Sequence, residues 1–191
     1  KPALDAKDFI SAHATFIICR MQLGIDMGGT KIEGIVLDFQ GRERARKRIS
    51  TPAGDYSATV RAAADLVEIL SSETNLATNV PIGVGIPGSV SPVSGLIKNA
   101  NSTCLIGNRL DRDLAEATGR AVRLANDANC FVVSEATDGA GAGHAVVFGV
   151  ILGTGVGGAI SINGELINGF NAIAGEWGHN PLPWPQVLDG R

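Results

Sequence analysis

The chain has few cysteines and little net charge. Its 191 residues include three cysteines, at positions 19, 104 and 130, and the formal net charge is −3. An odd number of cysteines at this spacing matches neither a disulfide framework nor a closed metal site. We therefore expect a reducing, cytoplasmic location. The slightly acidic balance argues against general nucleic-acid binding, which usually needs a basic surface.

Long apolar runs and a P-loop are also missing. No apolar stretch is long enough to cross a bilayer, so no membrane partner is expected. Asp5, Asp8 and His13 interrupt the first twenty residues, which argues against a signal peptide. Met21 directly precedes the first predicted strand, so residues 1–20 are expected to be a leader extension outside the fold. No G-x-x-x-x-G-K-[ST] run occurs, which excludes a P-loop enzyme.

Glycine is plentiful, and the most informative glycines lie between two predicted strands in residues 23–38. Gly28 and Gly29 predict a turn that is open to positive φ and whose N–H groups can surround an anion. Thr30 adds a hydroxyl, Lys31 adds a cation, and Asp26 can hold a metal ion or its water. This combination suits a metal–polyphosphate. The alternative is an ordinary hairpin with a solvated turn.

The order of predicted elements indicates an α/β protein with two domains. Residues 21–121 contain a β-β-β-α-β-α series, with helices expected over 56–70 and 110–118. Residues 122–191 are expected to begin a second domain, with a strand over 122–125, a helix to about residue 137, and strands over 145–152 and 159–162. Because the second part repeats the strand–glycine turn–strand device, we expect two related halves with a ligand cleft between them.

A second glycine-rich stretch, Gly153-Thr154-Gly155-Val156-Gly157-Gly158, lies between two predicted strands. It matches the dinucleotide pattern G-x-G-x-x-G, as does Gly83–Gly88, but neither stretch opens a helix as the Rossmann fingerprint requires. We interpret residues 153–158 as a second phosphate-holding hairpin, with Gly153, Thr154, Gly155, Gly157 and Gly158 as its contacts. A plain glycine turn is the alternative.

Asn126-Asp127 stands at the end of a predicted strand, where a helix begins. The positive end of a helix favours an ionised carboxylate, so Asp127 can accept a proton from a hydroxyl during phosphoryl transfer. Equally, Asn126 and Asp127 could only cap the helix.

Further polar groups suit a sugar. Glu176 and His179, in Gly175-Glu176-Trp177-Gly178-His179, offer an acceptor and a donor to neighbouring hydroxyls. Asn99 and Asn101 are additional candidates. The alternatives are a histidine satisfied within its loop and asparagines that stabilise a turn.

Together these stretches resemble the ROK family of sugar kinases, whose members have an actin-like, ribonuclease-H-type ATPase fold. The resemblance runs from Met21 to about Gln186. It rests on five stretches in order: Asp26–Lys31, Gly85–Gly88, Asn126–Cys130, Gly153–Gly158 and Gly175–His179. Residues 98–103 and 176–184 look most similar to bacterial fructokinases (manno-fructokinases).

The resemblance implies the role of each site residue. Asp127 is implied as the catalytic base. Asn126, Glu176 and His179 are implied to help bind the hexose, and both glycine hairpins are implied to serve the phosphates of ATP with Mg²⁺. A homodimer is expected by analogy. In the family, the histidine matching His179 binds a structural Zn²⁺ with cysteines of a later segment that this chain does not contain. The second domain is therefore expected to be truncated, which puts the activity of these 191 residues in doubt.

The sequence thus predicts an ATP-dependent hexose kinase, with D-fructose converted to fructose 6-phosphate as the first hypothesis. Mannose, glucose or N-acetylglucosamine are alternative substrates. A sugar-responsive regulator and a non-catalytic sugar-binding fragment are alternatives of another class. A regulator of this family would carry a helix-turn-helix domain, whereas residues 1–20 are too short for one.

Overall fold

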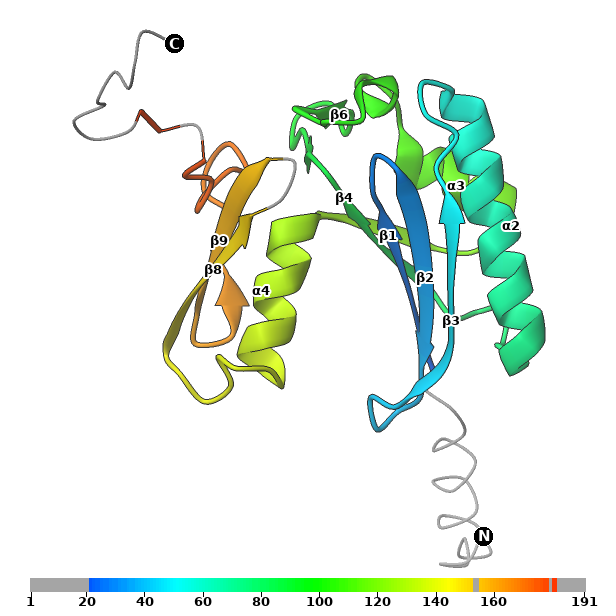
Figure 1. The fold of residues 1–191 in the computed structure, drawn as a ribbon, viewed down its shortest axis with the longest axis horizontal. Coiled ribbons are helices and arrows are strands. Elements are labelled where there is room, and N and C mark those ends of the chain that lie inside the picture. Colours follow the sequence, from blue (N-terminus) through cyan, green and yellow to red (C-terminus); the bar gives the residue numbers. More distant parts are fainter. Residues whose placement is uncertain (1–20, 153–154, 179, 182–191) are drawn as a thin grey trace, which may run out of the picture. The chain divides into compact units, whose positions relative to one another are not determined.

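The structure is a computed structural model in which residues 21–152, 155–178 and 180–181 are described. It divides into two compact units (Figure 1). The first comprises the chain up to Gly88 together with Leu96–Ala125, and the second comprises Ser89–Gly95 and the chain from Asn126. Each unit is described by itself below.

A five-stranded sheet forms the centre of the first unit, in the order β3-β2-β1-β4-β7. β1 pairs antiparallel with β2 and parallel with β4, and β2 pairs antiparallel with β3. The strands alternate between a buried and a more exposed face, as the period of two in a strand requires. The strands are β1 (Gln22–Met27), β2 (Lys31–Leu37), β3 (Glu43–Ser50), β4 (Ile82–Ile86) and β7 (Val122–Asn126).

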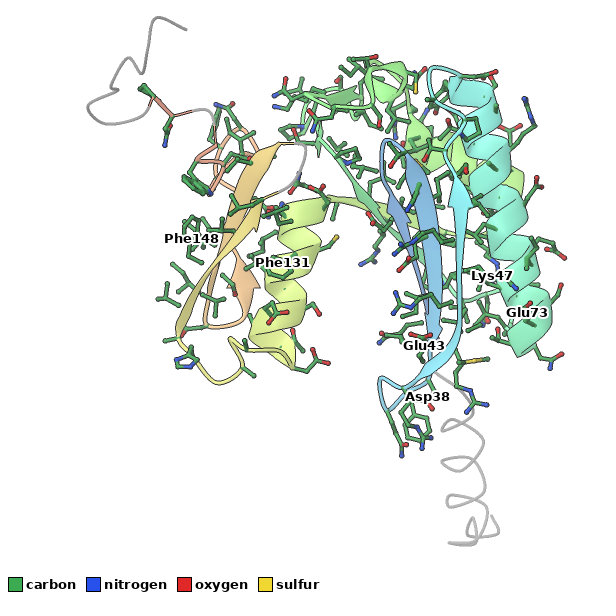
Figure 2. The ribbon with its side chains drawn as sticks, viewed as in Figure 1. Asp38, Glu43, Lys47, Glu73, Phe131 and Phe148 are labelled. Carbon is green, nitrogen blue, oxygen red and sulfur yellow. The ribbon has the colours of Figure 1, made fainter. Side chains whose placement is uncertain are left out.

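α2 (Tyr56–Thr74) packs against β2 and β3 of this sheet, and α3 (Leu110–Thr118) packs against α2 (Figure 1). The carboxylate of Asp55 caps α2 by accepting the N–H of Ala58 at 2.9 Å. α2 approaches β2 closely at Gly34, where a Cβ would lie 2.5 Å from a methyl carbon of Leu70. An ion pair of 2.7 Å between Lys47 and Glu73 also joins β3 to α2 (Figure 2). The close approach of Leu70 to Gly34 means that the packing of α2 on β2 requires a glycine in the middle of that strand.

Three short elements lie in the connection between β4 and α3. β5 and β6 form a two-stranded ribbon. The loop after it contains a single 3₁₀ turn, and α3 ends at Gly119, which has the left-handed conformation expected of a helix stop. These elements are β5 (Ser89–Val90), β6 (Ile97–Lys98) and η1 (Thr103–Leu105).

Apart from Ser89–Gly95, the described part of the second unit is one helix against a three-stranded antiparallel sheet in the order β10-β9-β8. Ala128 and Val132 of α4 and Ala159 of β9 form its buried centre. The turn at Asn163 and Gly164 has positive φ at both residues, as a tight hairpin requires. The elements are α4 (Asp127–Thr137), β8 (Val146–Leu152), β9 (Val156–Ile162) and β10 (Glu165–Leu166).

The α/β class and the expected series of elements are confirmed, with shifts at the ends of elements. α2 runs to Thr74 rather than residue 70, and β9 begins at Val156 rather than residue 159. The strand that was expected to open a second domain, β7, instead joins the first sheet beside β4. The domain boundary at residue 121 stays a prediction.

Candidate active site

The turn between β1 and β2 comprises Gly28, Gly29 and Thr30. Neither glycine has a positive φ, so the expectation of a positive-φ turn is wrong. Glycine is needed for a different reason, because a Cβ on Gly28 would lie 2.9 Å from the carbonyl oxygen of Lys31. The backbone therefore folds back on itself more closely than any side chain at residue 28 would permit.

Thr51, which directly follows β3, holds this turn at two points. Its hydroxyl donates to the carbonyl oxygen of Gly28 at 2.8 Å, and its N–H donates to the carbonyl oxygen of Thr30 at 3.0 Å. Thr51 is not among the residues that the sequence predicts for the site. The contact joins residues 23 positions apart, and no motif marks it.

The charged candidates at the turn lie on the exposed side of the strands. Asp26 and Lys31 are both exposed, and Asp26 stands opposite Glu33 in the β1–β2 register. Burial alone would raise the pKa of Glu33, but hydrogen bonds from Arg46 and Arg48 outweigh that effect and lower it. The two arginines thus compensate the charge of Glu33, the carboxylate that stands opposite Asp26.

A cavity of about 230 Å³ lies in the first unit beside the turn. Asn101 lines it, whereas Asn99 does not, and no charged side chain lines it. The hydroxyl oxygen of Ser102 is buried in its wall without a hydrogen-bond partner in the described part of the chain. It lies 3.3 Å from the position that a Cβ on Gly29 would take. The lining residues are Met27, Gly28, Gly29, Thr51, Ala53, Gly54, Thr59, Asn101, Ser102, Thr103, Cys104 and Leu105.

In the second unit, the candidate base lies in the first turn of α4. Asn126 caps this helix, because its side-chain oxygen accepts the N–H of Asn129 at 3.1 Å. The half-buried carboxylate of Asp127 accepts the N–H of Ala128 at 2.8 Å. The first N–H groups of a helix have no partner within the helix, and these two side chains supply acceptors for two of them. Capping by Asn126 is thus observed, whereas Asp127 lies one position inside the helix.

The loop that carries Glu176 lies directly on β9. A Cβ on Gly178 would lie 2.0 Å from the carbonyl oxygen of Val156, and Gly175 has a φ of +87° and a similarly close contact to Ala159. The indole N–H of Trp177 donates to the carbonyl oxygen of Gly157 at 3.1 Å. Glycine is therefore required at both ends of the loop.

This packing brings Glu176 close to the beginning of α4. A carboxylate oxygen of Glu176 lies 3.5 Å from the position of a Cβ on Gly157, and the methyl group of Ala128 lies 3.9 Å from the same point. Ala128 directly follows Asp127. The structure therefore brings the loop of Glu176 and the helix turn of Asp127 together within one unit, although they are about fifty residues apart in the sequence.

The remaining candidates are only partly described. Gly153, Thr154 and His179 lie outside the described residues. Gly155 is exposed between β8 and β9. Gly157 and Gly158 belong to β9, and a Cβ on Gly158 would lie 2.8 Å from the indole of Trp177. These two glycines therefore leave room for the loop of Glu176, and their contact with phosphate stays a prediction.

Within residues 21–152, 155–178 and 180–181, no three or more His, Cys, Asp or Glu side chains are grouped so as to hold a metal ion. No helix in that part of the chain is both long and apolar enough to span a membrane.

Comparison with known proteins places these features in one family. The model of the ROK family matches residues 22–188. The N-acetyl-D-glucosamine kinase of Pectobacterium atrosepticum is 42% identical over 163 residues, which cover 85% of this chain and 53% of that protein. The chain therefore spans about half the length of this curated relative.

Solved structures agree with this placement. A ROK family glucokinase from Streptomyces griseus, in complex with glucose and AMPPNP, has a TM-score of 0.71 and 31% identity, covering 83% of this chain and 50% of that one. An inorganic polyphosphate/ATP-glucomannokinase from an Arthrobacter strain has a TM-score of 0.68 and 34% identity, covering 77% and 60%. The expected actin-like α/β fold of ROK sugar kinases is thus confirmed, while the finer resemblance to fructokinases stays a prediction.

Proposed function

The chain belongs to the ROK family, and on that basis we propose that the protein transfers the γ-phosphoryl group of ATP to a hydroxyl of a hexose. The observation that carries the proposal is the arrangement at the beginning of α4. There the carboxylate of Asp127 lies in the positive end of the helix. A carboxylate oxygen of Glu176 and the methyl group of Ala128, the next residue of that turn, both lie within 4 Å of the Cβ position of Gly157. A carboxylate in this position suits proton transfer from an alcohol.

The second unit would supply the groups that act on the sugar. Asp127 accepts the proton of the attacking hydroxyl, which becomes more acidic as its oxygen bonds to phosphorus. Glu176 accepts hydrogen bonds from other hydroxyls, and Asn126 and His179 contribute further polar contacts. In the first unit, Asn101 at the cavity wall and Asn99 on the same loop are proposed as additional contacts with the hexose.

The turn of Gly28, Gly29 and Thr30 would hold the phosphates of ATP in the first unit, and the stretch from Gly153 to Gly158 would do so in the second. The first turn suits this role because it has no side chain at residues 28 and 29 and because Lys31 follows it directly in the sequence. Asp26 would hold Mg²⁺ or one of its waters. When bound, Mg²⁺ neutralises charge that develops on the phosphates. No step of the proposal depends on zinc, because His179 would need three further ligands.

Two hexoses are candidates. N-acetyl-D-glucosamine is the first, because the relative that is 42% identical is a kinase of that sugar. Fructose is the second, because residues 98–103 and 176–184 resemble those of fructokinases. A coupled assay that compares these two sugars with mannose and glucose decides between them by kcat/KM.

The main test replaces Asp127 by Asn in the full-length protein. We expect kcat to fall by about 10²- to 10⁴-fold, as is usual for loss of a general base, while calorimetric titration still shows hexose binding. Asp138→Asn is the matched control, because Asp138 is an exposed carboxylate at the other end of the same helix. Undiminished turnover of Asp127→Asn would exclude Asp127 as the base.

A further inference from the structure

We propose that Thr51 is a positioning residue that fixes the Gly28–Thr30 turn in the shape that binds phosphate. The inference rests on the proposed role of this turn in holding ATP. Thr51 touches no reacting atom in this scheme. It acts through the backbone of the turn, whose own N–H groups meet the anion.

The geometry carries the argument, because one residue bonds to both ends of the turn. The hydroxyl of Thr51 donates to the carbonyl oxygen of Gly28, and its N–H donates to that of Thr30. In a planar trans peptide, a carbonyl and the N–H that follows it point in opposite directions. Fixing the Gly28 carbonyl towards Thr51 therefore directs the N–H of Gly29 to the opposite side, where an anion can accept it.

The two bonds differ in what the side chain contributes. The N–H bond of Thr51 continues the β2–β3 pairing past Lys31 and Ser50, so any residue other than proline can make it. The bond to Gly28 needs a hydroxyl. Since glycine is the most flexible residue and Gly29 and Thr30 are exposed, this hydroxyl restrains the part of the turn that strand pairing does not reach.

Two substitutions separate the hydroxyl from the rest of the side chain. Thr51→Val keeps the shape and the β-branch but leaves the Gly28 carbonyl without this donor, whereas Thr51→Ser keeps the donor. We expect Thr51→Val to raise KM for ATP by about tenfold, the usual effect of losing one hydrogen bond, with KM for the hexose within about twofold of wild type. Thr51→Ser should restore KM for ATP.

Thr118→Val is the matched control. Its hydroxyl donates to the carbonyl oxygen of Leu114 at 2.7 Å within α3 and accepts the N–H of Arg120 at 3.4 Å, so the substitution removes a hydroxyl donor, and one weaker acceptor, away from the turn. If Thr51→Val lowers the melting temperature as Thr118→Val does but leaves KM for ATP unchanged, the inference is wrong and Thr51 is merely structural. An equal rise in both KM values would also overturn it, because the effect would then not be specific to the nucleotide.

Equilibrium titration with a fluorescent ATP analogue separates this inference from the proposed function. If the wild type binds the analogue more tightly than Thr51→Val but phosphorylates no hexose, the inference is supported and the proposed function fails. If the wild type phosphorylates a hexose and Thr51→Val binds the analogue equally well, only the inference fails. A wild type that binds no nucleotide would overturn both.

Discussion

Trp177 donates its indole N–H to the carbonyl oxygen of Gly157 and so attaches the loop of Glu176 to β9. The attachment is backed by backbone packing, since Gly175 and Gly178 lie against the same strand at distances that exclude a side chain. Glu176 is thus positioned by its neighbours in the sequence rather than by its own charge alone. Substitutions beside Glu176 should therefore alter sugar binding without touching the carboxylate.

Gly178→Ala provides the stronger test of this relationship. The new Cβ would lie 2.0 Å from the carbonyl oxygen of Val156, so the loop must move away from β9. We expect KM for the hexose to rise by about tenfold or more. Trp177→Phe should raise it only a few fold, because the hydrogen bond that it removes is exposed and the backbone packing of the loop stays in place. Steady-state kinetics measures both effects.

Gly83→Ala is the control for Gly178→Ala, because its Cβ would approach no atom more closely than 4.0 Å. If Gly178→Ala and Gly83→Ala leave KM for the hexose equally unchanged, Glu176 is not part of the sugar site or its loop adjusts without consequence.

Asn126 has an observed role as a helix cap and a proposed role as a sugar ligand, and one pair of substitutions separates the two. Asn126→Asp keeps a side-chain oxygen that accepts the N–H of Asn129, so stability should change by less than about 0.5 kcal/mol. It removes the amide donor, so KM for the hexose should rise by about tenfold. Asn126→Ala should also lower stability by about 1 kcal/mol. Unchanged hexose affinity in Asn126→Asp would leave capping as the role of Asn126.

Arg120 is a buried arginine that binds carbonyl oxygens. Its guanidinium donates to the carbonyls of Ala77 at 2.6 Å and Val80 at 3.1 Å, and to the hydroxyl of Ser71 at 3.2 Å. These contacts tie the loop between α2 and β4 to the segment that leads into β7. We expect Arg120→Met to reduce the free energy of unfolding by about 2–4 kcal/mol, since the buried hydroxyl of Ser71 and the part-buried carbonyls of Ala77 and Val80 lose their donor.

Urea denaturation measures this loss, and Arg61→Met is the control because Arg61 is exposed on α2. The control should change stability by less than about 0.5 kcal/mol. If Arg120→Met also changes the free energy of unfolding by less than about 0.5 kcal/mol, water replaces the guanidinium as the donor to these acceptors.

The sequence predicted those features of the fold that depend on local patterns. The spacing of Val60, Ala63 and Val67 located α2, and the pair Asn163 and Gly164 located a hairpin turn that has the expected conformation. The place of β7 was harder to predict, because a strand followed by a helix opens a second domain as readily as it completes a first. The pairing of β7 with β4 depends on distant residues, so no local pattern indicates it.

At the candidate site, the sequence could indicate which residues carry chemistry but not what holds them. The need for glycine at residue 28 was attributed to positive φ, whereas its cause is a close approach to the carbonyl of Lys31. A threonine after a basic strand carries no local signal, and only the folded chain brings the hydroxyl of Thr51 beside Gly28. Such contacts arise from tertiary packing, and no local motif reports them.

Tyr56 joins the first turn of α2 to α3 by donating its hydroxyl proton to the carboxylate of Asp113. Burial raises the pKa of Tyr56, and the hydrogen bond to Asp113 raises it further. Tyr56 is the only tyrosine among these 191 residues, so in a protein of this length the absorbance of tyrosinate reports Tyr56 alone. We expect no tyrosinate until the pH is well above 10, the ordinary value, and an earlier titration in Asp113→Asn.

The raised pKa of Tyr56 also predicts how stability depends on pH. A group whose pKa is higher in the folded state binds more protons there, so its contribution is complete below about pH 10 and is lost as the pH rises towards the folded value. The free energy of unfolding should therefore fall more steeply above pH 10 in the wild type than in Tyr56→Phe. Parallel curves for the two proteins would mean that the hydroxyl of Tyr56 is not held by Asp113 in solution, because a solvated phenol titrates alike in both states.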